Sequence, residues 1–128
     1  GVYVCNDTNT VCELSQHIHA EIDMEVCGEH YDFPRETGRT DEMHTHKEKN
    51  LIHWHAPIHV DPQSQDVLGE DYDRVTIQAF LNQTKFSFPA TCPDNQTPKV
   101  NVSINGGVNE QGLNYYWVDG DKILVEYK

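Results

Sequence analysis

The chain has 128 residues, of which 37% are hydrophobic, so it can build a core and lacks the composition of a disordered protein. Its 21 acidic and nine basic side chains give a formal net charge of -12 at pH 7, which repels nucleic acids and anionic lipids and attracts cations. We therefore expect a single domain over residues 1–128 that binds no nucleic acid. No apolar run is long enough to cross a bilayer, and we expect no transmembrane segment.

The first predicted element is a strand over residues 17–26, in which apolar and polar side chains alternate without exception. One face is apolar, and the other carries His17, His19 and three acidic residues. Residues 27–29 then predict a turn into a short second strand over residues 30–33, so this part of the chain is expected to form a β-hairpin.

A similar alternation predicts another strand over residues 51–60, with His53, His55 and His59 opposite the apolar face. Pro57 interrupts this run and cannot donate a hydrogen bond to a neighbouring strand. It therefore indicates an edge position or a bulge, and a bulge would turn His59 to the other face.

The second half of the chain predicts a loop over residues 61–73, a short helix over 74–84 and strands over 99–105 and 122–127. Asn105-Gly106-Gly107 is a turn signal between the last two strands. This order predicts an α+β domain with a mixed or antiparallel sheet and one short packed helix, and a β-grasp-like arrangement fits it.

The four cysteines lack the C-x-x-C spacing of zinc or redox pairs and are expected to form two disulfides: Cys5, Cys12, Cys27 and Cys92. Three pairings are possible. Cys5–Cys12 with Cys27–Cys92 is favoured, because the first pair closes a short loop.

Disulfides indicate an extracytoplasmic protein. A chain that starts at Gly1 rather than at methionine is consistent with removal of a signal peptide, and with a trimmed chain. Four N-x-S/T sequons agree with export and are candidate glycosylation sites: Asn6, Asn82, Asn95 and Asn101. We expect a secreted glycoprotein.

All eight histidines lie between His17 and His59, and none lies in the rest of the chain. Six of them form three H-x-H pairs: His17 with His19, His44 with His46, and His53 with His55. In a strand this spacing places both imidazoles on one face, where they can share an ion. Three pairs on neighbouring strands would supply the nitrogens that copper and zinc sites use, so these six residues are the predicted metal ligands.

Copper is the predicted metal and zinc the alternative, because copper binds imidazole most tightly among the common divalent ions. His59, Glu48 and Met43 are further candidate ligands, and Glu21 and Asp23 are candidates for orienting the imidazoles. A ligand set on the face away from the core is expected to be exposed. It is therefore expected to release its ion in acid and to allow metal bridges between subunits.

The segment over residues 43–53 is similar to an uncharacterised prokaryotic extracytoplasmic domain type with the signature L-H-T-H-D-x-x-G-x-I-H-x-E. Residues 17–20 resemble its upstream H-x-H-A element, and residues 101–107 and 118–127 resemble its V-N-G strand and D-G-D-x-I-x-I-x-Y end. The resemblance implies the positions of five of the histidines and no activity: His17, His19, His44, His46 and His53. Where the signature has acidic residues, this chain has Lys47 and His55.

Two other functions compete with simple metal binding. An extracellular structural subunit would use metal-bridged histidines, and residues 1–4, to form oligomers or filaments. A cupin-like metalloenzyme would use His44, His46 and Glu48 as an H-x-H plus carboxylate set, which the surrounding glycine spacing does not favour. A blue-copper carrier is disfavoured because no histidine follows Cys92.

Overall fold

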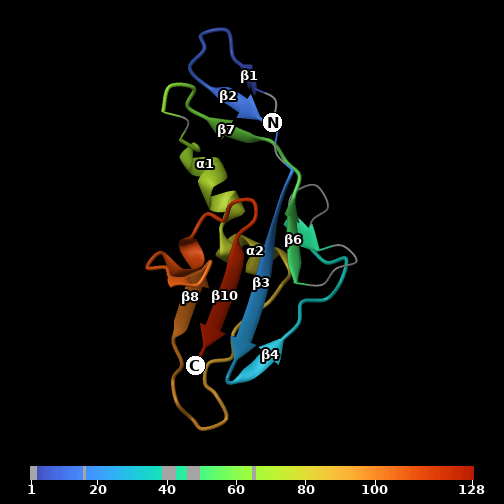
Figure 1. Cartoon of the computed structure of the whole chain (residues 1–128), viewed down its shortest axis with the longest axis vertical. Coiled ribbons are helices and arrows are strands. Elements are labelled where there is room, and N and C mark those ends of the chain that lie inside the picture. The colour runs from blue at the N-terminus through green and yellow to red at the C-terminus, as the bar shows by residue number, and fades with distance from the viewer. Residues whose placement is uncertain (1–2, 16, 39–42, 46–49, 65) are drawn as a thin grey trace.

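The computed structural model describes residues 3–15, 17–38, 43–45, 50–64 and 66–128. Its main sheet has seven strands, in the order β5-β6-β3-β10-β8-β9 with β4 also paired to β3. The strands are β3 (Ile18–Val26), β4 (Glu29–Tyr31), β5 (Met43–Thr45), β6 (Leu51–Trp54), β8 (Val100–Ile104), β9 (Gly107–Val108) and β10 (Lys122–Tyr127). Figure 1 shows β3 and β10 side by side in the middle of the sheet.

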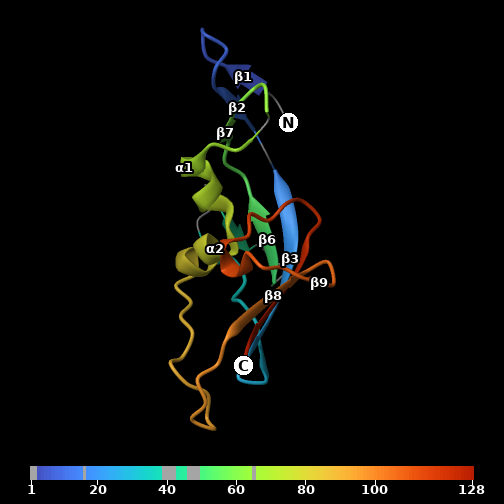
Figure 2. The same ribbon diagram turned by 90° about the vertical axis from the view of Figure 1, so that its left-hand side faces the viewer.

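The predicted α+β class is confirmed. The central strands β3 and β10 run parallel, and their outer neighbours β6 and β8 run antiparallel to them, so the order β6-β3-β10-β8 is β-grasp-like. The helices α1 (Gly69–Tyr72) and α2 (Ile77–Gln83) lie on one side of the sheet (Figure 2). The other side of the sheet is the one on which the polar residues of β3 lie.

The alternation over β3 decides which face meets the core. Ala20, Ile22 and Met24 are buried, whereas Glu21 and Asp23 between them are exposed. The buried side chains pack with residues from β6, α2 and β10, and the large members of the core include Trp54, Trp117, Phe33, Phe80 and Ile123. The polar face of β3 predicted from the sequence is therefore the outer face of the sheet.

A second, three-stranded sheet lies at the N-terminal end of the molecule (Figure 1). It consists of β1 (Tyr3–Cys5), β2 (Cys12–Leu14) and β7 (Ile58–Val60) in that order. The described part of the N-terminal stretch that was predicted to join a neighbouring subunit therefore pairs within its own chain, with Tyr3 opposite Leu14 and Val4 opposite Glu13.

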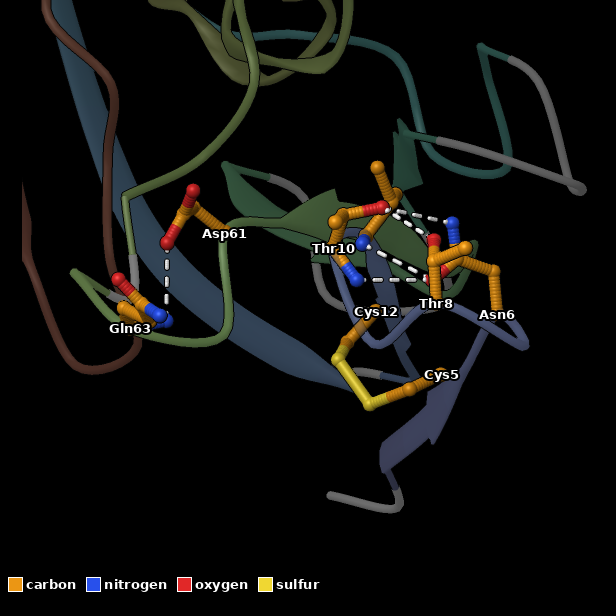
Figure 3. Close-up of a disulfide and its surroundings, with 8 residues drawn as sticks. Cys5, Asn6, Thr8, Thr10, Cys12, Asp61 and Gln63 are labelled. Atoms are coloured by element: carbon orange, nitrogen blue, oxygen red, sulfur yellow. Dashed lines mark hydrogen bonds between the residues drawn. A yellow bond between two sulfur atoms is a disulfide. The ribbon is translucent and has the colours of Figure 1, made fainter.

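Both predicted disulfides are present, Cys5–Cys12 and Cys27–Cys92. Cys5 and Cys12 are opposite each other on β1 and β2, and Figure 3 shows the bond closing the intervening loop. Inside that loop, the Asn6 side chain accepts a hydrogen bond from the Thr10 backbone N–H at 2.9 Å. Since all four cysteines are disulfide-bonded, none is a free thiol.

The single strand predicted over residues 51–60 is wrong. Residues 51–54 form β6 in the main sheet, and Ile58–Val60 forms β7 in the small sheet, paired with β2. The chain bends at residues 55–57, where Pro57 has no N–H for a ladder hydrogen bond. The chain thus leaves the main sheet before Pro57 and enters the small sheet after it, and Pro57 does not mark a bulge inside one strand.

Two boundaries in the middle of the chain also differ from the prediction. The expected loop over residues 61–73 contains the one-turn helix α1, and the expected helix over 74–84 divides into a 3-10 turn at Asp73–Val75 and α2. The division lies at Thr76, whose hydroxyl accepts the Ala79 backbone N–H at 3.1 Å and caps α2.

The predicted closing strand is confirmed with the same bounds, residues 122–127, and the strand at 99–105 is β8. The hairpin turns predicted at Cys27-Gly28 and Asn105-Gly106 have positive φ at both central residues, as two-residue hairpin loops require. No helix in the described part of the chain is long and apolar enough to span a membrane.

Candidate metal centre

The register of three strands brings histidines together on the outer face of the main sheet. In the β3–β6 ladder, His19 is directly opposite His53, and in the β5–β6 ladder, His44 is directly opposite the same residue. Directly opposed residues project to the same side of a sheet. His44, His53 and His19 therefore form a row across three strands, with His53 in the middle.

A second pair of imidazoles extends this row along the strands. His17 lies two residues before His19, and His55 lies two residues after His53. The ring centroids of His17 and His55 are 4.2 Å apart. Their rings also contact the first row, with centroid distances of 4.8 Å from His17 to His19 and 4.7 Å from His44 to His55.

The five side chains thus form a closed ring of imidazoles. The two remaining neighbour distances are 4.5 Å from His19 to His53 and 5.7 Å from His44 to His53, where the rings are stacked at 9°. We call this group the histidine ring: His17, His19, His44, His53 and His55. Residues that are far apart in the sequence, from three segments of chain, contribute to it.

Three members of the histidine ring are close enough to share an ion. One ligand nitrogen from each of His17, His19 and His53 lies within 4.8 Å of the others. An ion bound tetrahedrally to imidazoles at about 2.0–2.1 Å holds its nitrogens about 3.4 Å apart. Two of the three residues are on neighbouring strands and the third precedes β3, so binding an ion would bring their nitrogens closer together than they are in this structure.

The histidine ring is buried on one side and open on the other, which differs from the expected exposed surface. His53 is 7% exposed and His44 is 4% exposed, whereas His17 and His55 are exposed. His53 is covered because it has an imidazole directly across from it on each neighbouring strand. A bound ion would therefore have a buried side and an entrance lined by His17 and His55.

The close approach of Gly38 to β5 contributes to the burial of His44. Gly38 has a φ of +94° and pairs with His44 in an isolated bridge. A Cβ atom at Gly38 would lie 2.6 Å from the Met43 carbonyl oxygen and 2.9 Å from the His44 Cα atom. Only glycine fits this position, so the chain before β5 can pack directly against the strand that carries His44.

Asp119 is a contributor that the sequence did not reveal. Its Oδ1 atom accepts the His19 backbone N–H at 2.9 Å and lies 3.8 Å from the ring atom Nδ1 of His19. The carbonyl of His19 is also held, because it accepts a hydrogen bond from the Gly120 backbone N–H at 2.8 Å. At 3.8 Å the ring contact is longer than a hydrogen bond, so Asp119 holds the backbone of His19 and places a carboxylate near its imidazole. In the sequence, Asp119 belongs only to the D-G-D-x-I-x-I-x-Y segment of the resemblance, which assigns it no role at the histidines.

The remaining predicted ligands have different positions. His46 and Glu48 lie outside the described residues. Met43 is fully buried in the core, opposite Trp54 and on the other side of β5 from His44. Glu21 and Asp23 are exposed on β3 beyond His19, on the same face as the histidine ring.

His59 and His30 are in other parts of the molecule. His59 is on β7 of the small sheet, where its Nδ1 atom lies 2.7 Å from the Asp71 carboxylate. His30 is exposed on β4, with Nε2 at 2.7 Å from Asp32. The break of the predicted strand at residues 55–57 is the reason that His59 does not follow His53 and His55 on one face.

The four sequon asparagines are all exposed: Asn6, Asn82, Asn95 and Asn101. They lie in the loop between β1 and β2, in α2, in the loop before β8 and in β8. None of these elements carries a member of the histidine ring. Comparison of the chain with protein-family models, curated proteins and solved structures finds no match.

Proposed function

We propose that this chain is a secreted protein that binds one copper ion in the histidine ring. The observation that carries the proposal is the cluster formed by His17, His19 and His53, with His44 and His55 in contact with the same rings. Imidazole nitrogen is a ligand that copper, zinc and nickel accept, and the formal net charge of -12 favours the approach of cations. The two disulfides support an extracellular location.

Copper is favoured over zinc by the number of imidazoles. Structural zinc sites take four ligands in tetrahedral geometry, whereas the histidine ring brings five imidazoles into contact, three of them with nitrogens within 4.8 Å of one another. Copper(II) accepts tetragonal sites with nitrogen ligands and binds divalent-metal sites most tightly in the usual order of affinities. Zinc is the alternative occupant, and it would use a subset of the ring.

The test is a copper titration of the purified protein and of two variants. Trp54 is adjacent in sequence to His53 and is fully buried, so bound copper(II) is expected to quench its fluorescence. The wild type should bind one copper ion tightly, and His53→Ala should weaken that tight binding at least tenfold. His30→Ala is the matched control, because it removes a histidine outside the ring and should bind as the wild type does.

Two results would overturn the proposal. One is the absence of stoichiometric copper binding by elemental analysis of the folded wild type, together with unchanged thermal stability when copper is added. The other is equal weakening by His30→Ala and His53→Ala, which would show non-specific binding to surface histidines. A matching titration with zinc decides between the two metals.

A second candidate function is metal-bridged assembly. His17 and His55 are exposed at the entrance to the ring, so an ion bound there can accept a ligand from another copy of the chain. In this case the protein would sediment as an oligomer with copper and as a monomer after addition of a chelator. A cupin-like enzyme using His44, His46 and Glu48 would instead show turnover of a substrate.

A further inference from the structure

A second histidine site lies in the small sheet, away from the histidine ring. Glu13 on β2 and His59 on β7 are directly opposite each other in the antiparallel ladder, so their side chains project to the same face. The His59 Nε2 atom lies 3.8 Å from a Glu13 carboxylate oxygen, and both side chains are about half exposed. A ring nitrogen and a carboxylate oxygen, both of which can bind a metal ion, are thus adjacent at the surface.

Asp71 fixes which nitrogen of His59 faces outward. Its Oδ2 atom is 2.7 Å from His59 Nδ1 and also accepts the His59 backbone N–H at 2.6 Å, and its Oδ1 atom accepts from Arg74 at 2.7 Å. With Nδ1 held by the Asp71 carboxylate, Nε2 is the ring nitrogen that faces Glu13 and is placed to bind an ion.

This carboxylate–histidine arrangement is the one that orients histidine ligands at metal sites. It also occurs where a histidine serves as a general base. The position of Glu13 favours metal binding over general-base catalysis. A carboxylate beside Nε2 is a second ligand for a cation, but it occupies the place from which a general base would take a proton of a substrate. The site also borders an open cavity of about 480 Å³, which leaves room for the water ligands of an ion.

We propose that Glu13 and His59 form a second metal site, for a divalent ion such as zinc that accepts both imidazole and carboxylate. Asp71 is its positioning residue. With two protein ligands and the remaining positions open to water, this site binds more weakly and exchanges its ion faster than the five-imidazole ring. It does not depend on the histidine ring, since no residue is shared between the two sites.

The experiment is a zinc titration followed by calorimetry and by NMR signals of the imidazole nitrogens, on the full chain carrying His19→Ala and His53→Ala. These substitutions remove two of the three clustered ring ligands, so the zinc binding that depends on Glu13 is assigned to the second site. This variant should still bind one zinc ion weakly, and zinc should shift the NMR signal of His59 Nε2. Adding Glu13→Gln should weaken that binding at least tenfold, while a Glu29→Gln control, an exposed acid on β4, should not.

Asp71→Asn provides a second check, because it should weaken zinc binding and alter the tautomer of His59 in the NMR spectrum. The proposal is overturned if no zinc equivalent remains, if the His59 signals do not respond, or if Glu13→Gln binds as its control does. Failure of the copper proposal is a different result. In that case the wild type does not bind copper in the histidine ring, while the zinc ion that depends on Glu13 still binds.

Discussion

His19 and His53 are directly opposite each other across the β3–β6 ladder, with ring centroids 4.5 Å apart and ring planes at 78°. His19 is partly exposed and His53 is 7% exposed, so the pair reaches from the open side of the histidine ring to its buried side. A rigid ladder holds the two backbones, and only side-chain torsions remain to be ordered when an ion binds. This limits the entropy lost on metal binding.

Removal of the Asp119 carboxylate should weaken copper binding without unfolding the protein. Asp119→Ala loses the acceptor of the His19 backbone N–H and the carboxylate 3.8 Å from Nδ1. Its effect on copper affinity should be smaller than the roughly 10–100-fold that outer partners hydrogen-bonded to the imidazole contribute. Asp119→Asn keeps an oxygen acceptor and should lie between the wild type and the alanine variant. Copper titration measures the effect.

The control for this prediction is Asp23→Asn, an exposed acid on the same face of β3. It changes the net charge by the same amount as Asp119→Asn but lies further along the strand from His19. If Asp23→Asn weakens copper binding as much as Asp119→Asn does, the effect is one of overall charge, and Asp119 has no positioning role.

Acid should release the copper ion. A metal binds the neutral form of imidazole, and imidazoles in proteins take up a proton near a pKa of about 6.5, so protons and copper compete for the same lone pairs. Affinity is therefore expected to be full at about pH 7.5 and to fall steeply below about pH 6. Equilibrium dialysis at several pH values measures this, and copper retained in full at about pH 4.5 would argue against imidazole ligands.

Gly38→Ala should disturb the position of β5. The new Cβ would lie 2.6 Å from a backbone oxygen, in a conformation with φ of +94°. Gly28→Ala is the matched control, since Gly28 also has positive φ (+83°), but a Cβ atom there would have no neighbouring atom within 4 Å. Both variants carry a backbone strain of about 1–2 kcal/mol, and only Gly38→Ala adds a steric clash.

The measurement is chemical denaturation combined with copper titration. Gly38→Ala should be less stable than Gly28→Ala and should bind copper more weakly, because His44 moves with β5. Equal stability and equal copper affinity of the two variants would contradict the role assigned to the close contact between Gly38 and β5.

Asp121 should control both the turn before β10 and the titration of Tyr115. The buried carboxylate accepts from the Tyr115 hydroxyl at 2.8 Å, from the Val118 backbone N–H at 2.9 Å and from Asn105 at 3.0 Å. Burial, followed by the hydrogen bond to Asp121 and its charge, raises the pKa of Tyr115 to about 12. The variant Asp121→Asn removes that charge and should lower the pKa of Tyr115.

The sign of the pH effect follows from the direction of this shift. Because the folded pKa of Tyr115 lies above its ordinary value of 10.0, its stabilising contribution is complete below about pH 10 and is lost as the pH rises through about 12. Asp121→Ala leaves several donors without their acceptor and should cost roughly 2–4 kcal/mol of stability at neutral pH. Ultraviolet titration of tyrosine and denaturation curves measure the two effects.

The sequence alone determined the polar and apolar faces of β3, the closing strand, the hairpin turns and the α+β class, because these depend on neighbouring residues. Alternation of side chains has a period of two whatever the partner strand is. The sequence also predicted the two disulfide pairs. It identified the H-x-H pairs of the metal proposal, since strand geometry places residues at i and i+2 on one face.

Only the tertiary structure decided which histidines meet. The register that sets His53 opposite both His19 and His44, the break at Pro57 that separates His59 from His55, and the position of Asp119 beside His19 all depend on pairings between distant segments. A shift of one residue in register would turn the histidines toward the core, and no local pattern fixes that choice. The burial of one side of the ring has the same origin, because it comes from strands on both sides of β6.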